Sequence, residues 1–184
     1  ATYERQFPNT LRITITERKV TAIVALSSGP VAWYLGENNV WLEADQLNVP
    51  EGKTTATVAL EKATSEGELL ITDVPATVSP VAGTTATDAE IQAVMQYQST
   101  FSSELTSQIV SYSASSVDAI SVTLTNGVQV ALGSPTQIAD KEKVILAMLK
   151  QFPGELTYLN VRTPASPTYR RVSTGNVQSG SGVS

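Results

Sequence analysis

The sequence predicts an α+β fold, a mainly antiparallel β-sheet with two α-helices. Short apolar runs recur along the chain and are separated by turn signals such as "FPNT", "SSGP" and "GENN". The segment "ISVTLTNGVQVALGS" has the alternation and the Asn-Gly pair of a β-hairpin. Two longer segments instead space their apolar residues as an amphipathic helix does.

The first half of the chain is expected to form a meander of short strands. Leu11, Ile13 and Ile15 alternate with polar residues, which is typical of a half-buried strand. The further strands predicted here cover residues 20–26, 31–35, 40–42 and 69–75, and "TATVAL" at 55–60 is a weaker strand candidate. We expect the strand of Leu11 to extend the main sheet beside residues 20–26, or to be held by another copy.

The second half contains both predicted helices. "TDAE" at Thr87–Glu90 has the pattern of a capping box, and it predicts a helix over residues 88–107. A strand is expected at 109–115, followed by the hairpin, in which Asn126-Gly127 predicts a type I′ turn. The second helix follows, with Ser134 as N-cap and Pro135 at its first position, and Gly154 ends it.

The last predicted strand is "LTYLNVRT", residues 156–163. Leu159 and Val161 share one face, which we expect to point at the core, and Tyr158, Asn160 and Arg162 share the other. Pro164 and Pro167 end the strand, and residues 173–184 are rich in Gly and Ser, which predicts a disordered tail. A last strand can leave an unpaired edge, and this edge is a template for an added strand. The alternative is that the tail folds back and covers this edge itself.

Composition excludes several classes of function. The chain has 184 residues, 41% of them hydrophobic, and a net charge of −5, which argues against nucleic acid and anionic membrane surfaces as partners. It has no Cys and no His, which removes thiolate nucleophiles, Ser-His-Asp triads and Cys- or His-based metal sites. No S-x-x-K, G-x-S-x-G or phosphate-loop motif occurs. We therefore predict no enzymatic activity and no catalytic, cofactor-binding or metal-binding residues.

Three weaker candidates were weighed against ordinary structural roles. Asp140 and Glu142 flank Lys141 and suit an acid/base pair, but a solvated helix face explains them better. Trp33, Tyr34 and Trp41 suit a glycan-stacking platform, although aromatic residues on strands are more often core or cross-strand pairs. Glu37, Glu43 and Asp45 offer oxygens to calcium without the spacing of a calcium loop.

Several stretches together resemble a known family. "YERQFPNTLRITITERK" is similar to the last strand of a POTRA module. "NGVQVALGS", a helix carrying Lys141 and "LTYLNVRTP" resemble the β domain of the FtsQ/DivIB cell-division proteins, in which a G-x-x-V-x-L-G hairpin precedes a helix and a strand ending in Y-[IVL]-D-[VL]-R. Asn160 departs from the usual Asp, and residues 45–67 are longer than the usual connection.

The resemblance implies a non-enzymatic divisome scaffold. Residues 1–18 would be the C-terminal strand of a truncated POTRA module, 19–172 the β domain and 173–184 the tail. The protein would be a single-pass protein of the cell membrane with this domain extracytoplasmic at the division septum, its span lying upstream of a chain that starts abruptly. FtsB/DivIC-like and FtsL-like proteins would be its partners, in the regulation of septal peptidoglycan synthesis.

Residue-level expectations follow for the partner surface. A partner segment is expected to add a β-strand beside the last strand, with Arg162 selecting an acidic residue and Tyr158 and Tyr169 as apolar anchors. The expected contact residues are Tyr158, Asn160, Arg162, Thr163, Pro164, Tyr169 and Arg170. An extracytoplasmic glycan- or peptidoglycan-binding module that uses Trp33 and Trp41 is the alternative function.

Overall fold

The computed structural model describes residues 2–6, 10–14 and 18–172. Ile15 and the predicted tail at 173–184 lie outside these residues. The chain divides into two compact units: Ala1–Leu70 with Ala76–Ala86, and Ile71–Pro75 with Thr87–Ser184. Each unit is described by itself below.

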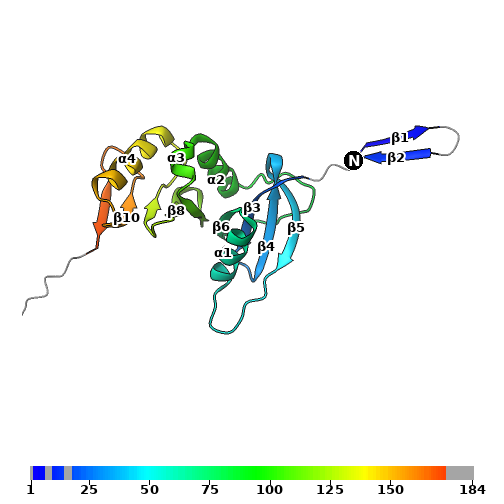
Figure 1. The fold of residues 1–184 in the computed structure, drawn as a ribbon, viewed down its shortest axis with the longest axis horizontal. Helices are drawn as coiled ribbons and strands as arrows, with labels where there is room; N and C mark the ends of the chain where they lie inside the picture. The colour runs from blue at the N-terminus through cyan, green and yellow to red at the C-terminus, as the bar shows by residue number, and fades with distance from the viewer. Residues whose placement is uncertain (1, 7–9, 15–17, 173–184) are drawn as a thin grey trace, which may run out of the picture. The chain divides into compact units, whose positions relative to one another are not determined.

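The elements follow one another as Figure 1 labels them. The strands are β1 (Thr2–Gln6), β2 (Thr10–Thr14), β3 (Val20–Leu26), β4 (Val31–Gly36), β5 (Val40–Gln46), β6 (Leu69–Val74), β7 (Ile109–Ala114), β8 (Ile120–Leu124), β9 (Gln129–Ala131), β10 (Leu156–Asn160) and β11 (Thr168–Arg171). The α-helices are α1 (Thr55–Glu66), α2 (Ala89–Thr100), α3 (Ser103–Thr106) and α4 (Ile138–Gln151), and two short 3₁₀ turns lie at Glu37–Asn39 and Val117–Ala119. The α+β class is confirmed, and the described residues contain four α-helices where two were expected.

The N-terminal segment forms a hairpin of its own. β1 pairs antiparallel with β2, with Tyr3 opposite Ile13 and Arg5 opposite Leu11. These two strands make a separate two-stranded sheet, so the expectation that the strand of Leu11 would extend the main sheet beside β3 is wrong. The sequence pattern identified β2, but β1 has too few apolar residues to indicate a strand by periodicity.

The first unit is built on the antiparallel strands β3, β4 and β5, with α1 packed on one face. Its core joins strand residues to two small helix residues: Ile23, Ala25, Ala32, Leu47, Ala59, Ala63 and Leu70. The strand expected at residues 55–60 is wrong, because this segment is the first half of α1. Thr54 caps the helix by accepting a hydrogen bond from the Thr57 amide, and Gly67 ends it in the left-handed conformation at φ 74°.

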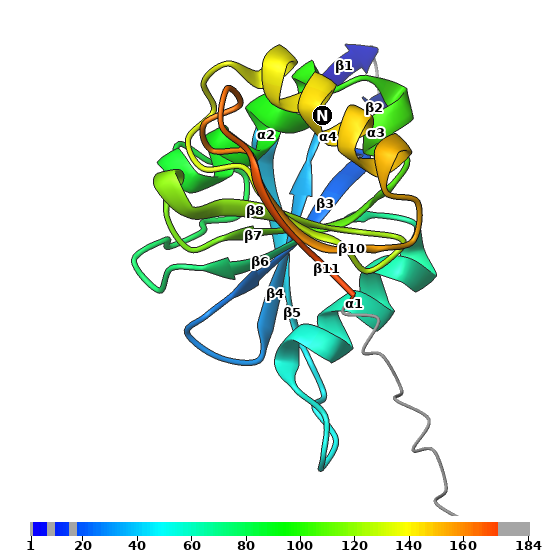
Figure 2. The ribbon, with the colours of Figure 1, turned by 90° about the vertical axis from the view of Figure 1, so that its left-hand side faces the viewer.

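The second unit has its strands in the order β11–β10–β9–β8–β7–β6. Figure 2 shows α2, α3 and α4 together on one face of these strands. β7, β8 and β9 pair antiparallel, as predicted, and β10 pairs parallel with β9, so the sheet is partly parallel. The parallel pair follows from chain order, since α4 lies between β9 and β10 and acts as the crossover that a parallel connection needs.

The predicted hairpin forms, but its turn differs from the expectation. Ile120, Val122 and Leu124 on β8 and Val128, Val130 and Leu132 after the turn are all buried, as their alternation predicts. Only Gly127 has a positive φ, of 81°, so the turn is not type I′. The Gly127 amide donates to the Leu124 carbonyl and Leu124 N–H donates to the Val128 carbonyl, which is a three-residue loop with glycine at its left-handed position.

Both predicted helix starts are displaced. Asp88, not Thr87, is the N-cap of α2, and its side chain makes no capping hydrogen bond, so the capping box is wrong. The helix expected over 88–107 is interrupted at Phe101, which is extended, and α3 follows as a separate turn. α4 begins at Ile138 with Gln137 as N-cap, so Ser134 and Pro135 lie in the loop that precedes it.

Candidate partner-binding surface

The free edge expected on the last predicted strand is covered by the chain itself. β11 pairs antiparallel with β10, which places Tyr158 opposite Arg170, Leu159 opposite Tyr169 and Asn160 opposite Thr168. β10 therefore lies between β9 and β11, and the expectation that it offers its own edge to a partner is wrong. The alternative named the tail, residues 173–184, which lies outside the described residues; the segment that covers this edge is β11, residues 168–171. Sequence reasoning missed β11 because Thr168–Arg171 has no buried residue and hence no apolar pattern.

β11 is the last strand of the second unit, and its outer side is the edge that the described residues leave open. The Val172 amide donates to the Glu155 carbonyl at 2.7 Å, so Val172 faces β10. Peptide groups along a strand alternate in direction, which turns the N–H and C=O of Tyr169 and Arg171 away from β10. These two residues therefore offer the backbone groups that a further strand would use.

An aromatic and cationic cluster lies on the helix-facing side of this edge. The Tyr169 ring stacks on Phe152, which follows α4, with centroids 5.1 Å apart. The Arg171 guanidinium lies 4.9 Å from the Phe152 centroid, and its Nη1 contacts Glu155 Oε2 at 3.4 Å. Tyr169 nevertheless remains 43% exposed. The expected anchor Tyr169 is thus held in place by Phe152 and Arg171, two residues that the sequence analysis did not single out.

The opposite face of the same strands carries the other expected contact residues. The Arg170 guanidinium lies over the Tyr158 ring, 5.4 Å from its centroid, because the two residues are directly opposite on β11 and β10. Leu159 and Val161 are fully buried, while Tyr158 and Asn160 are partly exposed, as their alternation predicts. Tyr158 and Tyr169 therefore lie on different faces and cannot anchor one partner side chain together.

Arg162 projects from the end of β10 without an acidic partner among the described residues. Its backbone N–H donates to Asn160 Oδ1 at 3.1 Å, so Asn160 caps the strand end instead of offering that oxygen outward. The methylene stem of Arg162 lies on Gly133, where an added Cβ would sit 2.9 Å from Arg162 Cγ. Gly133 also has φ +70°, so a side chain at this position would strain the backbone and displace Arg162.

A buried pair, Tyr97 and Lys141, fixes the loop that contains Gly133. Lys141, on α4, is fully buried, and its Nζ donates to the Ser134 carbonyl at 2.6 Å and to Tyr97 Oη at 3.0 Å. Tyr97, on α2, donates in turn to the Ser134 carbonyl at 2.7 Å. Burial lowers the pKa of the Lys141 ammonium, and no carboxylate of the described residues contacts it to compensate. This pair links α2 and α4 to the loop beneath Arg162.

The two remaining contact residues, Thr163 and Pro164, begin the loop between β10 and β11. Thr163 is exposed and its carbonyl accepts from the Ser166 amide at 3.0 Å, which forms a tight turn. Pro164 is buried. The expected partner residues are therefore brought to one end of the second unit, but on two faces and a loop and not along a single strand edge.

The alternative candidates weighed on sequence have structural roles. Trp41 is 2% exposed and packs edge-on against Trp33 at 6.2 Å, so the pair does not present two open rings to a glycan. Asp140 pairs with Lys143, whereas Glu142 accepts hydrogen bonds from Ser102 at the start of α3. Asp140 and Glu142 thus serve different contacts and do not act as one acid/base pair.

Comparison with known proteins identifies the family. The family model described as "Cell division protein FtsQ/DivIB, C-terminal" matches residues 55–162, which is more than half of the chain. The match runs from the start of α1 past the end of β10. A search of the curated proteins found no match. Within the part of the chain that the structure describes, none of the helices combines the length and hydrophobicity needed to cross a membrane.

Proposed function

Because this chain belongs to the FtsQ/DivIB family of cell-division proteins, we propose that its second unit is a docking module of the division machinery. It binds FtsB/DivIC-like and FtsL-like proteins and so helps regulate septal peptidoglycan synthesis. A segment of the partner adds a β-strand to the outer side of β11. The protein works as a non-enzymatic scaffold, held in the cell membrane by one span with this region outside it.

The open edge of β11 is the single observation that carries this proposal. All four residues of the strand are exposed, and the N–H and C=O groups of Tyr169 and Arg171 point away from β10. Unpaired backbone groups at a sheet edge are the template on which an extended peptide adds as a strand. The stacked Phe152 and Tyr169 rings provide an apolar contact along the same edge.

Charge gives this edge its selectivity. The chain carries a net charge of −5, yet Arg162, Arg170 and Arg171 lie at this end of the second unit. An acidic partner segment is therefore attracted here and repelled by much of the remaining surface. Arg162 pairs with an acidic side chain of the partner, because it has an exposed guanidinium and a stem already fixed on Gly133.

The N-terminal hairpin fits the same proposal. We assign residues 1–18 to the end of a POTRA module, residues 19–172 to the partner-binding β domain and residues 173–184 to a tail. Within the described part of the chain, β1 and β2 pair only with each other. A two-stranded hairpin is marginally stable alone in water, so further strands or helices are needed to stabilise it.

Binding to the FtsB/DivIC-like protein of the same organism tests the proposal. The 184-residue chain is titrated with the extracytoplasmic segment of that protein, and the affinity is measured by calorimetry. We expect saturable binding, with loss of amide-exchange signal at Tyr169 and Arg171 on NMR. Saturable binding that leaves these two amides unprotected would place the interface elsewhere, and absence of binding would remove the proposed partner.

A further inference from the structure

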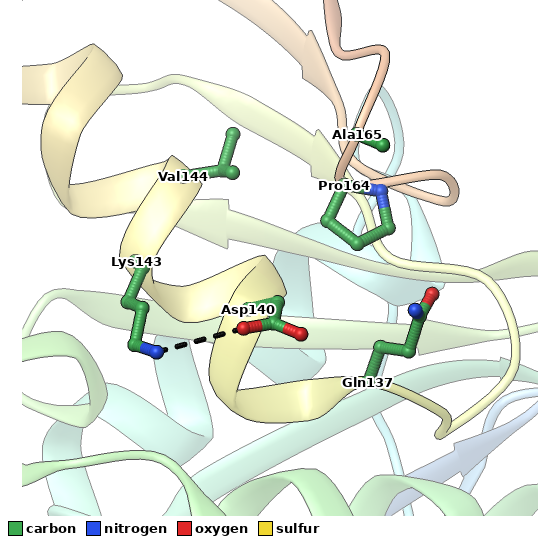
Figure 3. Close-up of a pocket in the computed structure, with 6 residues that line it drawn as sticks. All are labelled: Gln137, Asp140, Lys143, Val144, Pro164 and Ala165. Carbon is green, nitrogen blue, oxygen red and sulfur yellow. Dashed lines mark ion pairs between the residues drawn. The ribbon is translucent and has the colours of Figure 1, made fainter.

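A pocket of about 300 Å³ opens beside the loop between β10 and β11. Figure 3 shows α4 side chains on one side of it and the loop residues on the other. The lining residues are Gln137, Asp140, Lys143, Val144, Pro164 and Ala165. Its volume is at the lower end of the roughly 300–1,000 Å³ that ligand pockets span, so it suits one large side chain better than a larger ligand.

The chemistry of the lining favours an uncharged apolar occupant. Val144, Pro164 and Ala165 provide an apolar surface. The charged rim has one residue of each sign, and these already pair with each other, Lys143 Nζ with Asp140 Oδ1 at 3.5 Å. A charged side chain entering the pocket would find no uncompensated opposite charge, whereas an apolar side chain would bury hydrocarbon against three residues.

The backbone at the rim is held in a costly conformation. Gln137, the N-cap of α4, has φ 51° and ψ 38°, the left-handed region that a residue with a Cβ rarely occupies. Such strain is found where the surroundings impose it, and it concentrates at binding sites. Two hydrogen bonds from the first turn of α4 hold Gln137 in this conformation, because the amides of Asp140 and Lys141 both donate to the Gln137 carbonyl. The pocket rim is therefore pre-formed.

The pocket is lined by part of the loop that leads into β11. Pro164 and Ala165 belong to the loop of residues 161–167 that joins β10 to β11, and β11 begins at Thr168. A partner strand that pairs with β11 and continues beyond Thr168 therefore ends next to this loop. Ala165 lies three residues before Thr168, so a partner residue just beyond the added strand lies near the loop that lines the pocket.

We propose that this pocket receives one apolar side chain from the same partner segment that adds to β11, immediately beyond the added strand. The inference rests on the proposed function. Backbone pairing along β11 accepts many sequences, because it uses no side chain. An apolar anchor at a fixed distance from the strand end sets the register of the partner and discriminates between segments of similar charge.

Filling the pocket tests this proposal. The substitution Ala165→Trp places an indole over the pocket from an exposed loop position, and Ala147→Trp places the same side chain on an exposed part of α4 that does not line it. We expect A165W to weaken binding of the FtsB/DivIC-like extracytoplasmic segment at least tenfold and A147W to leave it unchanged. Wild-type affinity for A165W would overturn the pocket proposal.

Crosslinking provides a second readout that does not depend on affinity. The chain has no Cys, so Ala165→Cys creates a single thiol that can form a disulfide with single cysteines placed along the partner segment. Crosslinks confined to one or two partner positions beyond the strand support the anchor, and crosslinks spread evenly along the segment oppose it. If Arg171→Pro abolishes binding while A165W does not, the strand addition stands and the pocket proposal fails.

Discussion

Each of the two units ends in an edge strand, and the two edges differ in whether another segment of the chain covers them. β5 closes the first unit, and the segment that ends at Ala86 covers its first half: Trp41 N–H donates to the Thr84 carbonyl at 2.9 Å and Gly83 N–H to the Trp41 carbonyl at 2.7 Å. Glu43 follows on its second half with an exposed carboxylate, whereas the next carboxylate, that of Asp45, pairs with Lys62 Nζ at 2.8 Å. β11 closes the second unit with Tyr169, Arg170 and Arg171, and no described segment pairs with its outer side.

The contrast separates a protected edge from an available one. A covering segment and like charges are the ordinary means by which proteins prevent edge-to-edge association. β5 has both. β11 instead has an aromatic ring and two arginines. The positive charge of the arginines repels the same edge of another copy but attracts an acidic strand. The difference lies in the side chains and in the covering segment, because both strands have the same kind of backbone groups to offer.

Blocking the backbone of β11 should have the largest effect. Arg171→Pro removes an N–H that points away from β10, so the internal β10–β11 pairing is retained while a partner strand loses a hydrogen bond and meets the proline ring. We expect partner affinity to fall by roughly a hundredfold. Calorimetry measures it, with Arg171→Ala as the control that loses the side chain alone. Equal affinities for the two variants would show that the outer backbone of β11 is not used.

Removing the Arg162 guanidinium should have an intermediate effect. Arg162→Ala is expected to weaken partner binding by about 1–3 kcal/mol, the value of a hydrogen bond to a charged group, and to reduce its salt dependence. Arg18→Ala, at an exposed arginine of the first unit, is the matched control. An R162A variant that keeps wild-type affinity and salt dependence would remove Arg162 from the interface.

Gly133 allows the placement of Arg162 to be tested separately from its charge. Gly133→Ala would put a Cβ 2.9 Å from Arg162 Cγ and force that side chain to move. We expect G133A to weaken partner binding in the wild type but to have little further effect on an R162A background. Affinities for the two single variants and the double variant make this comparison. Fully additive losses would mean that Gly133 acts through the fold and not through Arg162.

The buried Lys141 should give the second unit its own pH dependence. Its pKa is lowered in the folded chain, so between that pKa and the ordinary lysine value the unfolded chain binds more protons. The free energy of unfolding therefore increases as pH rises through this window, and below it the cost of burying the charge is present in full. Lys141→Met should remove this increase. Urea unfolding at a series of pH values up to the ordinary lysine pKa measures the slope for both proteins, and parallel lines would contradict the assignment.

The smallest expected effect concerns the protected edge. Glu43→Thr removes an exposed charge from β5 but leaves the pairing with Thr84 and Gly83 in place. We expect only a slight increase in self-association, visible by sedimentation at high protein concentration. The corresponding charge removal on β11, Arg170→Thr, should raise self-association more, because no segment covers that strand. Equal changes at both edges would mean that charge and not the covering segment protects β5.

The strands with clear alternation or apolar runs could be predicted from the sequence, and the exposed ones could not. Val122 and Leu124 alternate with polar residues, and their burial follows from that pattern. β11 has four exposed residues, so its position depends on pairing with β10 and no hydrophobic pattern in the sequence indicates it. α1 was mistaken for a strand because "TATVAL" is rich in β-branched residues, although Thr54 and Gly67 mark its two ends.

The expected contact residues stay a prediction, and the structure arranges them differently from the single strand edge that the sequence predicts. Leu159 and Val161 face the core and Arg162 is exposed, as the sequence predicts. Whether a strand lies at an edge depends on what returns beside it, and that is a tertiary property. The Tyr97–Lys141 contact joins residues 44 positions apart, so no local pattern indicates it.

The division of β6 between the two units limits where this chain can be truncated or recombined without disrupting a unit. Leu69 and Leu70 belong to the first unit and Ile71–Pro75 to the second, after which Ala76–Ala86 returns to the first. A truncation anywhere between residues 70 and 87 removes part of one unit or of the other. Gene recombination at this position would also produce an incomplete unit, so α1 and the partner-facing strands must be exchanged together as one genetic segment.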